Sequence, residues 1–303
     1  MKRLEVAAEA DGRRIDRVLA EAGPRALVMK WIRTGAVRRN GSAVAGPGER
    51  VAAGDVIELD EGEPRVAATA AGGPGELSVL YEDAVLLVVD KPAGLACHPG
   101  TLTGADSLFE RVAARLRARG RGEAAAGLAQ RLDRGVSGVV PFGIGAESLR
   151  ALARAVESGA ARKTYVALVH GVVGGDEGVV DVRLRVTDQP MGDRPRTVPD
   201  PIRGLRAVTR YSVARRFSDA TLLEVEIETG RTHQIRAHLL HLGHPILGDP
   251  RYGDAARNAR LRETFGVTRP LLHAARLLVP HPATGAPVDV AAPLPADMTL
   301  PLK

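Results

Sequence analysis

The stretch Gln130-Arg131-Leu132-Asp133-Arg134-Gly135-Val136-Ser137-Gly138 runs directly into the apolar segment Val139-Val140-Pro141-Phe142. Within it a single acidic side chain, Asp133, stands between two arginines and precedes a turn of small residues. Nearby positive charge favours the carboxylate form of an aspartate, and glycine lets the backbone approach a ligand closely. From these residues alone, a ligand-binding loop and a surface loop with an exposed ion pair are equally good interpretations.

The glycines in and after this loop do not form a nucleotide-binding motif. The segment contains neither the dinucleotide fingerprint nor the Lys-Ser/Thr pair of a phosphate-binding loop. The apolar segment predicts a strand, in which Pro141 is unusual because proline cannot donate a ladder hydrogen bond.

A second informative stretch covers residues 228–238 and continues through residues 243–253. Its apolar side chains at helical spacing are expected to face the core: Ile235, Leu239 and Leu242. Arg236 lies next to this stripe and would be partly buried. A buried arginine needs a carboxylate or phosphate partner, because an unpaired buried charge is very costly.

Four histidines lie in or after the same segment: His233, His238, His241 and His244. Their spacing lacks the i, i+4 pair of a zinc-binding helix, and no glutamate lies among them to act as a base. We therefore expect histidines that form hydrogen bonds or contact substrate, and no metal site.

The overall composition is that of a globular protein. The 303 residues suggest about two domains, with 45% hydrophobic and 26% charged residues. No stretch reaches the ~18 apolar residues of a membrane helix, and no secretory signal is expected after Met1-Lys2-Arg3. Cys97 is the only cysteine, which excludes intramolecular disulfides and cysteine-based zinc sites. We expect a cytoplasmic protein without membrane association.

The net charge of +6 permits a polyanionic partner, and the positive charge is concentrated near the start of the chain. Residues 12–41 carry eight Arg or Lys side chains and two acidic ones, around two predicted short helices and a turn. A solvated surface would explain a lone charged run, but this clustering favours phosphate contacts. We predict a small basic domain over residues 1–60, a linker over 61–76, and a larger domain over 77–303.

The predicted elements indicate an α+β protein. Strand-like runs in the larger domain cover residues 85–89, 165–169, 208–213 and 222–227, and helical runs cover 107–119 and 147–158. The small domain is expected to contain helices over 14–20 and 26–34 and a strand over 56–59. Because strands and helices do not alternate regularly, we expect a mixed, mostly antiparallel sheet with peripheral helices, preceded by a small α+β domain.

Together these segments resemble the RluA-type family of RNA pseudouridine synthases. Gln130–Gly138 is similar to the family's catalytic His-Arg-Leu-Asp-x-x-Thr-Ser-Gly motif, and Gly230–His238 to its Gly-Arg-Thr-His-Gln-Ile-Arg-x-His motif. Further matching segments are Leu80–Gly94 with His98-Pro99, Lys163-x-Tyr165-x-Ala167, Leu272-His273-Ala274 and His281-Pro282. The first domain resembles the small αL-type RNA-binding domain often fused in front of these enzymes.

The resemblance implies an isomerase that converts uridine in RNA to pseudouridine without a cofactor. It implies Asp133 as nucleophile or stabiliser of the sugar cation, with attack on the sugar and on the uracil ring both open. Tyr165 would stack on the target base or assist proton removal, and Arg236 would hold Asp133 through a forked pair of hydrogen bonds. The expected RNA contacts are Arg131, Arg231, His233, Arg13, Arg14, Arg17, Lys30, Arg33, Arg38 and Arg39.

Three positions depart from the family motif: Gln130 replaces the usual His, Gly135 replaces a usually polar or bulkier residue, and Val136 replaces the usual Thr. The expected substrate is structured RNA, with large-subunit ribosomal RNA ahead of transfer RNA, and the protein is expected to be a monomer. Two alternatives remain open: a catalytically weakened RNA-binding or ribosome-assembly factor of the same fold, and a metal-dependent hydrolase that uses the histidines.

Overall fold

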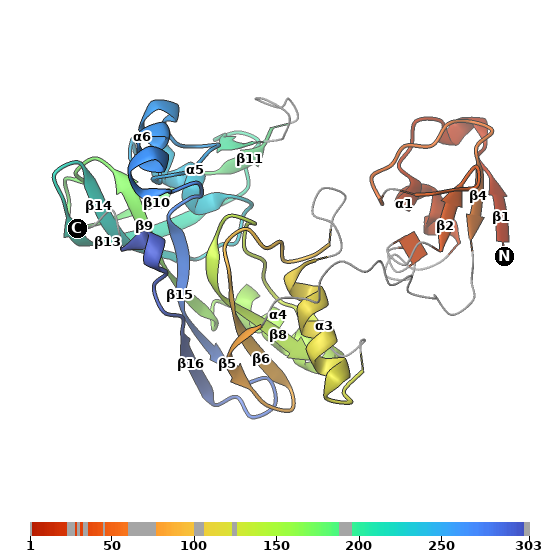
Figure 1. Cartoon of the computed structure of the whole chain (residues 1–303), viewed down its shortest axis with the longest axis horizontal. Coiled ribbons are helices and arrows are strands. Elements are labelled where there is room, and N and C mark those ends of the chain that lie inside the picture. Colours follow the sequence, from red (N-terminus) through yellow and green to blue (C-terminus); the bar gives the residue numbers. More distant parts are fainter. Residues whose placement is uncertain are drawn as a thin grey trace. The chain divides into compact units, whose positions relative to one another are not determined.

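The computed structural model describes residues 2–22, 28, 31–32, 36–44, 46–59, 77–99, 106–122, 126–187 and 196–299. These residues divide into two compact units, with residues up to 59 in the first and residues from 77 in the second (Figure 1). The predicted linker over 61–76 lies outside the described residues, as do Lys30 and Arg33.

The first unit is a small α+β structure built on a four-stranded antiparallel sheet. The strand order is β1 (Lys2–Glu5), β4 (Val56–Leu59), β2 (Val37–Arg39) and β3 (Ser42–Ala43). Short helices lie between β1 and β2: η1 (Ala8–Ala10), α1 (Ile15–Val18) and η2 (Leu19–Glu21). The strand expected over 56–59 is confirmed, and the helix expected over 14–20 forms as α1 and η2.

Alternating side chains of β4 supply the core of the first unit. Ile57 and Leu59 are buried and pack in one cluster with Ile15, Leu19 and Trp31 from the helical segments. The second predicted helix, over 26–34, is described only at residues 28, 31 and 32, which are helical and buried. The small sheet thus has one apolar face, which the helices cover.

The second unit is built on a ten-stranded sheet. Eight strands run in the order β10 (Glu177–Asp181), β13 (Val208–Arg216), β14 (Ala220–Ile227), β9 (Arg162–His170), β15 (Leu272–Pro280), β8 (Ser137–Ile144), β6 (Leu86–Lys91) and β5 (Ser78–Glu82). Off this path, β16 (Pro287–Ala291) pairs with β15, and β7 (Ala126–Leu128) pairs with β8. Among the strands of the described residues, only β8 and β15 pair in parallel, so the expected mixed, mostly antiparallel sheet is confirmed.

Helices and a separate two-stranded ribbon surround this sheet. The helices are α3 (Leu108–Ala118), α4 (Ala146–Glu157), α5 (Gln234–His241), α6 (Ala255–Phe265) and η4 (Ala296–Met298). The ribbon consists of β11 (Leu184–Val186) and β12 (Thr197–Pro199), and it contacts α5. Among the described residues, none of the helices is long and apolar enough to cross a membrane.

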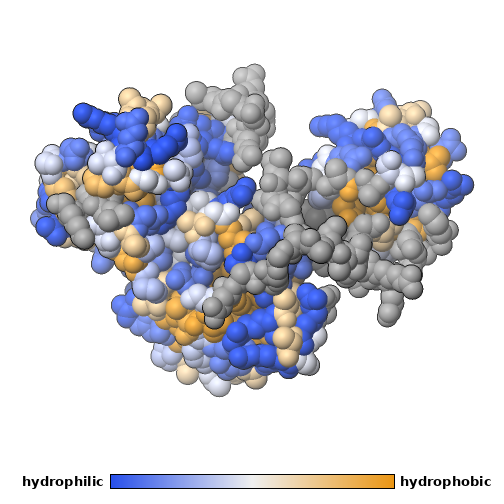
Figure 2. Space-filling model, in the orientation of Figure 1, coloured by the Kyte–Doolittle hydropathy of each residue, from blue (hydrophilic) through white to orange (hydrophobic). Residues whose placement is uncertain are grey.

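The sheet is buried on both faces around β6. Leu87 and Val89 lie in one core cluster with residues of α3, whereas the alternate residues Leu86 and Val88 lie in another with Leu152 of α4. This follows from the period of a strand, which sends successive side chains to opposite faces. Figure 1 shows α3 and α4 beside β6 and β8, and Figure 2 shows hydrophilic residues around smaller hydrophobic areas on the face in view.

The strand β8, which follows the Asp133 loop, is buried along its whole length. At its start, Gly138 has a φ of 112°, and a Cβ there would lie 2.2 Å from the carbonyl oxygen of Ala274 on β15. Only glycine therefore permits this close approach of β8 and β15. Pro141 pairs with Val88 of β6, and on the other edge of β8 it lies between the residues that pair with β15 and those that pair with β7.

One part of the expected apolar stripe is wrong. Ile235 and Leu239 on α5 are buried, but Leu242 is 36% exposed. Leu242 keeps helical backbone angles as the C-cap of α5, and its N–H donates to the carbonyl oxygen of His238, so its exposure comes from its position at the end of the helix. Arg236, which was expected to be partly buried, is almost fully buried.

Candidate active site

Asp133 lies on a loop that is fixed by contacts on both sides of it. Before it, the Cys97 thiol donates to the carbonyl oxygen of Leu132 and accepts from its backbone N–H, each at 3.3 Å. After it, the carbonyl oxygen of Arg134 accepts from the backbone N–H of Gly94 at 2.8 Å and from Lys91 Nζ at 3.3 Å. The Asp133 side chain itself is 28% exposed. The loop thus presents a half-exposed carboxylate in a fixed position.

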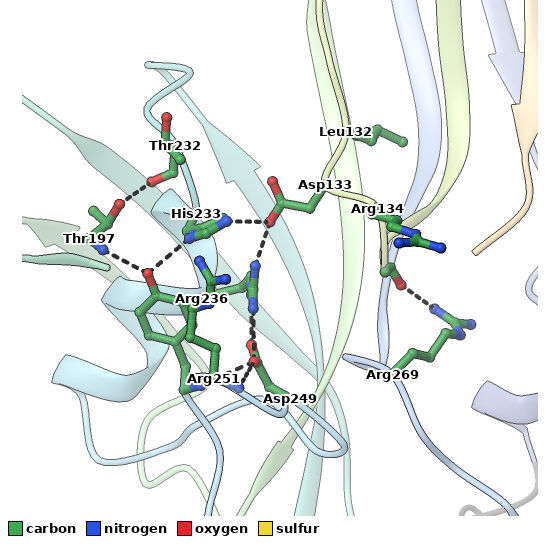
Figure 3. Close-up of polar contacts among 12 residues, drawn as sticks. Leu132, Asp133, Arg134, Thr197, Thr232, His233, Arg236, Asp249, Arg251 and Arg269 are labelled. Carbon is green, nitrogen blue, oxygen red and sulfur yellow. Dashed lines mark hydrogen bonds and ion pairs between the residues drawn. The ribbon is translucent and has the colours of Figure 1, made fainter. Parts of the chain in front are cut away.

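Arg236 of α5 lies between two carboxylates, Asp133 and Asp249 (Figure 3). Its Nη1 donates to Asp133 Oδ2 at 2.8 Å, so the expected contact is present. The forked pair of hydrogen bonds goes to Asp249 instead, from Nε to Oδ2 at 2.7 Å and from Nη2 to Oδ1 at 2.9 Å. The expectation that the fork would hold Asp133 is therefore wrong, because the fully buried carboxylate occupies that edge of the guanidinium.

The positive charge of Arg236 is compensated by the negative charges of Asp249 and Asp133. Burial opposes the positive charge of Arg236, but hydrogen bonds and negative charge from Asp249 and Asp133 outweigh it and raise its pKa. Burial likewise opposes the charge of Asp249, but Arg236 and the backbone N–H groups of Arg251 and Tyr252 lower its pKa overall. At neutral pH, Arg236 is therefore a permanent cation whose Nη1 still donates to Asp133.

His233 approaches Asp133 from a strained turn at the start of α5. Its φ of 53° lies in the left-handed region, which residues other than glycine rarely adopt. Nε2 lies 3.7 Å from Asp133 Oδ2, and Nδ1 lies 3.0 Å from the Tyr252 hydroxyl. Burial, reinforced by the charges of Arg236 and Arg251, lowers the pKa of His233 despite the nearby Asp133. The imidazole is thus neutral at neutral pH.

A cleft of about 960 Å³ lies beside Asp133, a volume typical of small-molecule binding sites. It brings together the six residues that sequence reasoning assigned to the catalytic domain: Asp133, Tyr165, Arg236, Arg131, Arg231 and His233. Tyr165 lies on β9 and is almost fully buried. Burial, with the charge of Asp133, raises the pKa of Tyr165, so its hydroxyl stays protonated at neutral pH.

The arginines expected to contact RNA from the first unit differ in their surroundings. Arg14 forms a forked pair with Asp16 at 3.0 and 2.9 Å, and Arg39 lies 3.3 Å from Glu49. Their charges are thus partly compensated within the unit. Three further arginines have exposed side chains: Arg13, Arg17 and Arg38.

Two of the remaining histidines form internal hydrogen bonds. His238 Nδ1 lies 2.8 Å from Thr209 Oγ1, and its Nε2 lies 2.9 Å from the carbonyl oxygen of Val182. His244 Nδ1 lies 2.8 Å from the carbonyl oxygen of His170. Within the described ranges, no three His, Cys, Asp or Glu side chains are grouped so that they could hold a metal ion.

The structure accommodates the three departures from the family motif. A Cβ at Gly135 would lie 2.9 Å from Pro270 Cδ, so a larger residue would require Pro270 to move. Val136 is buried in the same core cluster as Tyr165, where its apolar side chain is suited to the surroundings. Gln130 lines the cleft.

The sequence model of the RNA pseudouridylate synthase family matches residues 85–241, just over half of the chain. The chain belongs to this family. The resemblance to RNA pseudouridine synthases found in the sequence is thereby confirmed, and the enzyme is an RNA pseudouridine synthase, an isomerase. The matched residues include Asp133, Tyr165 and Arg236.

Curated relatives match the synthase over nearly its whole length. The uncharacterized RNA pseudouridine synthase YlyB of Bacillus subtilis (strain 168) is 34% identical over 307 residues, which cover 98% of this chain and 96% of the relative. The ribosomal large subunit pseudouridine synthase D of Xanthomonas campestris pv. campestris is 37% identical over 310 residues, covering 95% and 88%. The solved structure of human RNA Pseudouridylate Synthase Domain Containing 1 shares the fold, with a TM-score of 0.59 at 24% identity, covering 74% of this chain and 86% of that one.

Sequence reasoning missed two residues of the synthase's site, Asp249 and Tyr252. Both lie in the segment 243–253, which was singled out without a role for either residue. A signal for Asp249 was available, because it is the first acidic residue after Arg236 in the chain, and a buried arginine needs a carboxylate. No local pattern distinguishes Tyr252 from a tyrosine packed in the core.

We expect Asp249→Asn to destabilise the synthase by about 3 kcal/mol at neutral pH, because it leaves buried Arg236 with only half of its negative partners. The pKa of Asp249 is lowered in the folded protein, so its stabilising contribution is present above the ordinary pKa of aspartate. That contribution is lost as the pH falls through the folded pKa. The free energy of unfolding, measured with urea, should therefore differ most between the variant and wild type near pH 7, and the difference should shrink below about pH 4.

Asp176→Asn is the matched control, because it breaks an ion pair with Arg216 in which the aspartate side chain is 90% exposed. Such exposed pairs contribute little, and this variant should unfold as wild type does. Wild-type stability of Asp249→Asn at neutral pH would contradict the role assigned to Asp249.

Proposed function

We propose that this synthase isomerises specific uridines of large-subunit ribosomal RNA to pseudouridine, with Asp133 as nucleophile and without a cofactor. The observation that carries the proposal is the half-exposed Asp133 carboxylate, held at the cleft by a buried and permanently charged arginine. Oδ2 accepts from Arg236, whereas Oδ1 has no hydrogen-bond partner among the described residues. Figure 3 shows this second oxygen pointing away from Arg236, so it is free to attack.

The chemistry requires little beyond such a nucleophile and a shaped cleft. The bond between ribose C1′ and uracil N1 breaks, the base turns, and a bond forms between C1′ and C5. The proton that C5 loses is balanced by the proton that N1 gains, so there is no net oxidation or reduction. A carboxylate suits this reaction because it can form and release a covalent intermediate.

We assign Tyr165 a stacking role against the target base. Its ring lines the cleft together with Asp133. Because burial raises the pKa of its hydroxyl, Tyr165 is poorly suited to act as a base at neutral pH. Stacking on an aromatic ring is a common way to hold an extruded base, and bases in RNA loops cost least to extrude.

The proposed RNA contacts lie at the cleft and on the first unit. At the cleft, Arg131, Arg231 and His233 would contact the bound RNA. On the first unit, the proposed contacts with phosphates are Arg13, Arg14, Arg17, Lys30, Arg33, Arg38 and Arg39. Relatives named as ribosomal large subunit pseudouridine synthases C and D support ribosomal RNA as the target. We further propose that the enzyme acts as a monomer in the cytoplasm.

Replacement of the nucleophile should separate turnover from binding. We expect Asp133→Asn to reduce tritium release from RNA labelled at uridine C5 by at least about 1,000-fold, because an amide cannot act as the nucleophile. RNA affinity should persist, since the removal of one negative charge does not weaken phosphate attraction. Asp289→Asn, which alters another arginine-paired aspartate on β16, should keep wild-type turnover. Measurable turnover by Asp133→Asn would overturn the proposed mechanism.

The proposed role of the first unit predicts a change in salt dependence. We expect replacement of Arg13, Arg17 and Arg38 by Gln to weaken RNA binding. The slope of log affinity against log salt concentration should fall by up to about 0.9 for each phosphate that the protein no longer neutralises. Arg276→Gln, which removes an arginine of β15 paired with Asp289, is the control and should leave the slope unchanged. An unchanged affinity and slope in the triple variant would show that these arginines do not contact phosphates.

A further inference from the structure

The Tyr252 hydroxyl connects the β11–β12 ribbon with the neighbourhood of Asp133. Tyr252 is 2% exposed, and the guanidinium carbons of Arg196 and Arg236 lie 4.7 and 4.8 Å from the centroid of its ring. Its hydroxyl oxygen accepts from the backbone N–H of Thr197 on β12 at 2.8 Å. The same oxygen lies 3.0 Å from His233 Nδ1, and Figure 3 shows the contacts of Thr197 and His233.

The donors and acceptors in this chain of contacts determine which nitrogen of His233 carries the proton. Because the hydroxyl oxygen of Tyr252 already accepts from Thr197, its own proton needs an acceptor in a buried position. Among the described residues, His233 Nδ1 is the acceptor within reach. A neutral imidazole that accepts at Nδ1 carries its proton at Nε2. Nε2 is the nitrogen that lies 3.7 Å from Asp133 Oδ2.

We propose that Tyr252 selects the Nε2–H tautomer of His233, and that His233 is thereby a positioning residue that directs an N–H group at Asp133. This inference rests on the proposed role of Asp133 as nucleophile. His233 and Arg236 then approach the same carboxylate oxygen, Oδ2, from two directions. Together they orient the carboxylate so that Oδ1 remains free for the uridine.

The ribbon also holds the backbone that presents His233. Thr197 Oγ1 donates to the carbonyl oxygen of Thr232 at 2.9 Å, next to the left-handed residue 233. Strained backbone persists only where the surrounding contacts fix it. Thr197 therefore stabilises the position of His233 in two ways. Its N–H contacts Tyr252, which contacts the His233 side chain, and its hydroxyl contacts the backbone at Thr232.

The tautomer can be measured without turnover by 15N NMR of the whole enzyme labelled at histidine. The resonances of His233 are identified as those that disappear in His233→Gln. We expect wild-type His233 at pH 7 to show an unprotonated Nδ1 and a protonated Nε2. In Tyr252→Phe, which keeps the ring but removes the hydroxyl, this preference should be lost. A protonated Nδ1 in the wild-type enzyme would overturn the inference.

Turnover of matched variants tests the consequence for Asp133. Tyr252→Phe should lower kcat about tenfold or more, with KM and RNA affinity unchanged, as expected for the loss of a group that orients a reacting residue. Tyr81→Phe is the control, because it removes another tyrosine hydroxyl, which donates to Asp83 at 2.7 Å outside the cleft. Wild-type kcat in Tyr252→Phe would contradict the positioning role.

Replacement of His233 by Gln or by Asn distinguishes a role in positioning Asp133 from a role in the left-handed backbone at residue 233. The amide nitrogen of His233→Gln can reach the place of Nε2, whereas that of His233→Asn reaches only the place of Nδ1. We therefore expect Gln to retain more of the wild-type kcat than Asn does. If His233 merely occupied a left-handed position, Asn would be the better replacement, because asparagine tolerates that conformation. The reverse order of activity would therefore overturn the inference.

These outcomes are separable from failure of the proposed function. An inactive Asp133→Asn enzyme combined with a protonated Nδ1 on His233 overturns the positioning role alone. An active Asp133→Asn enzyme overturns the proposed mechanism and the positioning role with it.

Discussion

The site depends on the neutralisation of one buried cation, Arg236. A buried guanidinium requires negative partners, and fully buried Asp249 supplies most of the compensation through a fork of two hydrogen bonds. Because Asp249 neutralises most of the charge of Arg236, Nη1 of Arg236 can donate to Asp133. Asp133 can therefore remain half exposed at the cleft. A single carboxylate could not both satisfy the buried charge and keep an oxygen free for substrate.

The fold brings these groups together from distant parts of the chain. Asp133 precedes β8, Tyr165 lies on β9, and Arg236 lies on α5, 103 residues after Asp133. The central strands fix this arrangement, because β15 pairs with both β8 and β9 and approaches β8 closely at Gly138. The ribbon adds Thr197 from a further segment, so the site is complete only when all of these segments are in place.

Much of this arrangement could be predicted from the sequence, because the relevant signals are local. Hydrophobic periodicity indicated the strands and helices, and the motifs around Asp133 and Arg236 indicated the family and one contact. The partner in the fork could not be predicted, because residue spacing does not determine which of two carboxylates meets a given edge of a guanidinium. The exposure of Leu242 depended on where α5 ends, and the contacts of Tyr252 depended on a ribbon with no distinctive pattern.

The most direct test of the proposed function is a map of pseudouridines in total RNA from cells that carry either the wild-type enzyme or Asp133→Asn as their only copy. The proposal predicts that pseudouridine disappears at one or a few uridines of large-subunit ribosomal RNA in the variant cells, with all other sites retained. Loss confined to transfer RNA would contradict the proposed target. A map identical to wild type would contradict the assignment of Asp133 as the nucleophile.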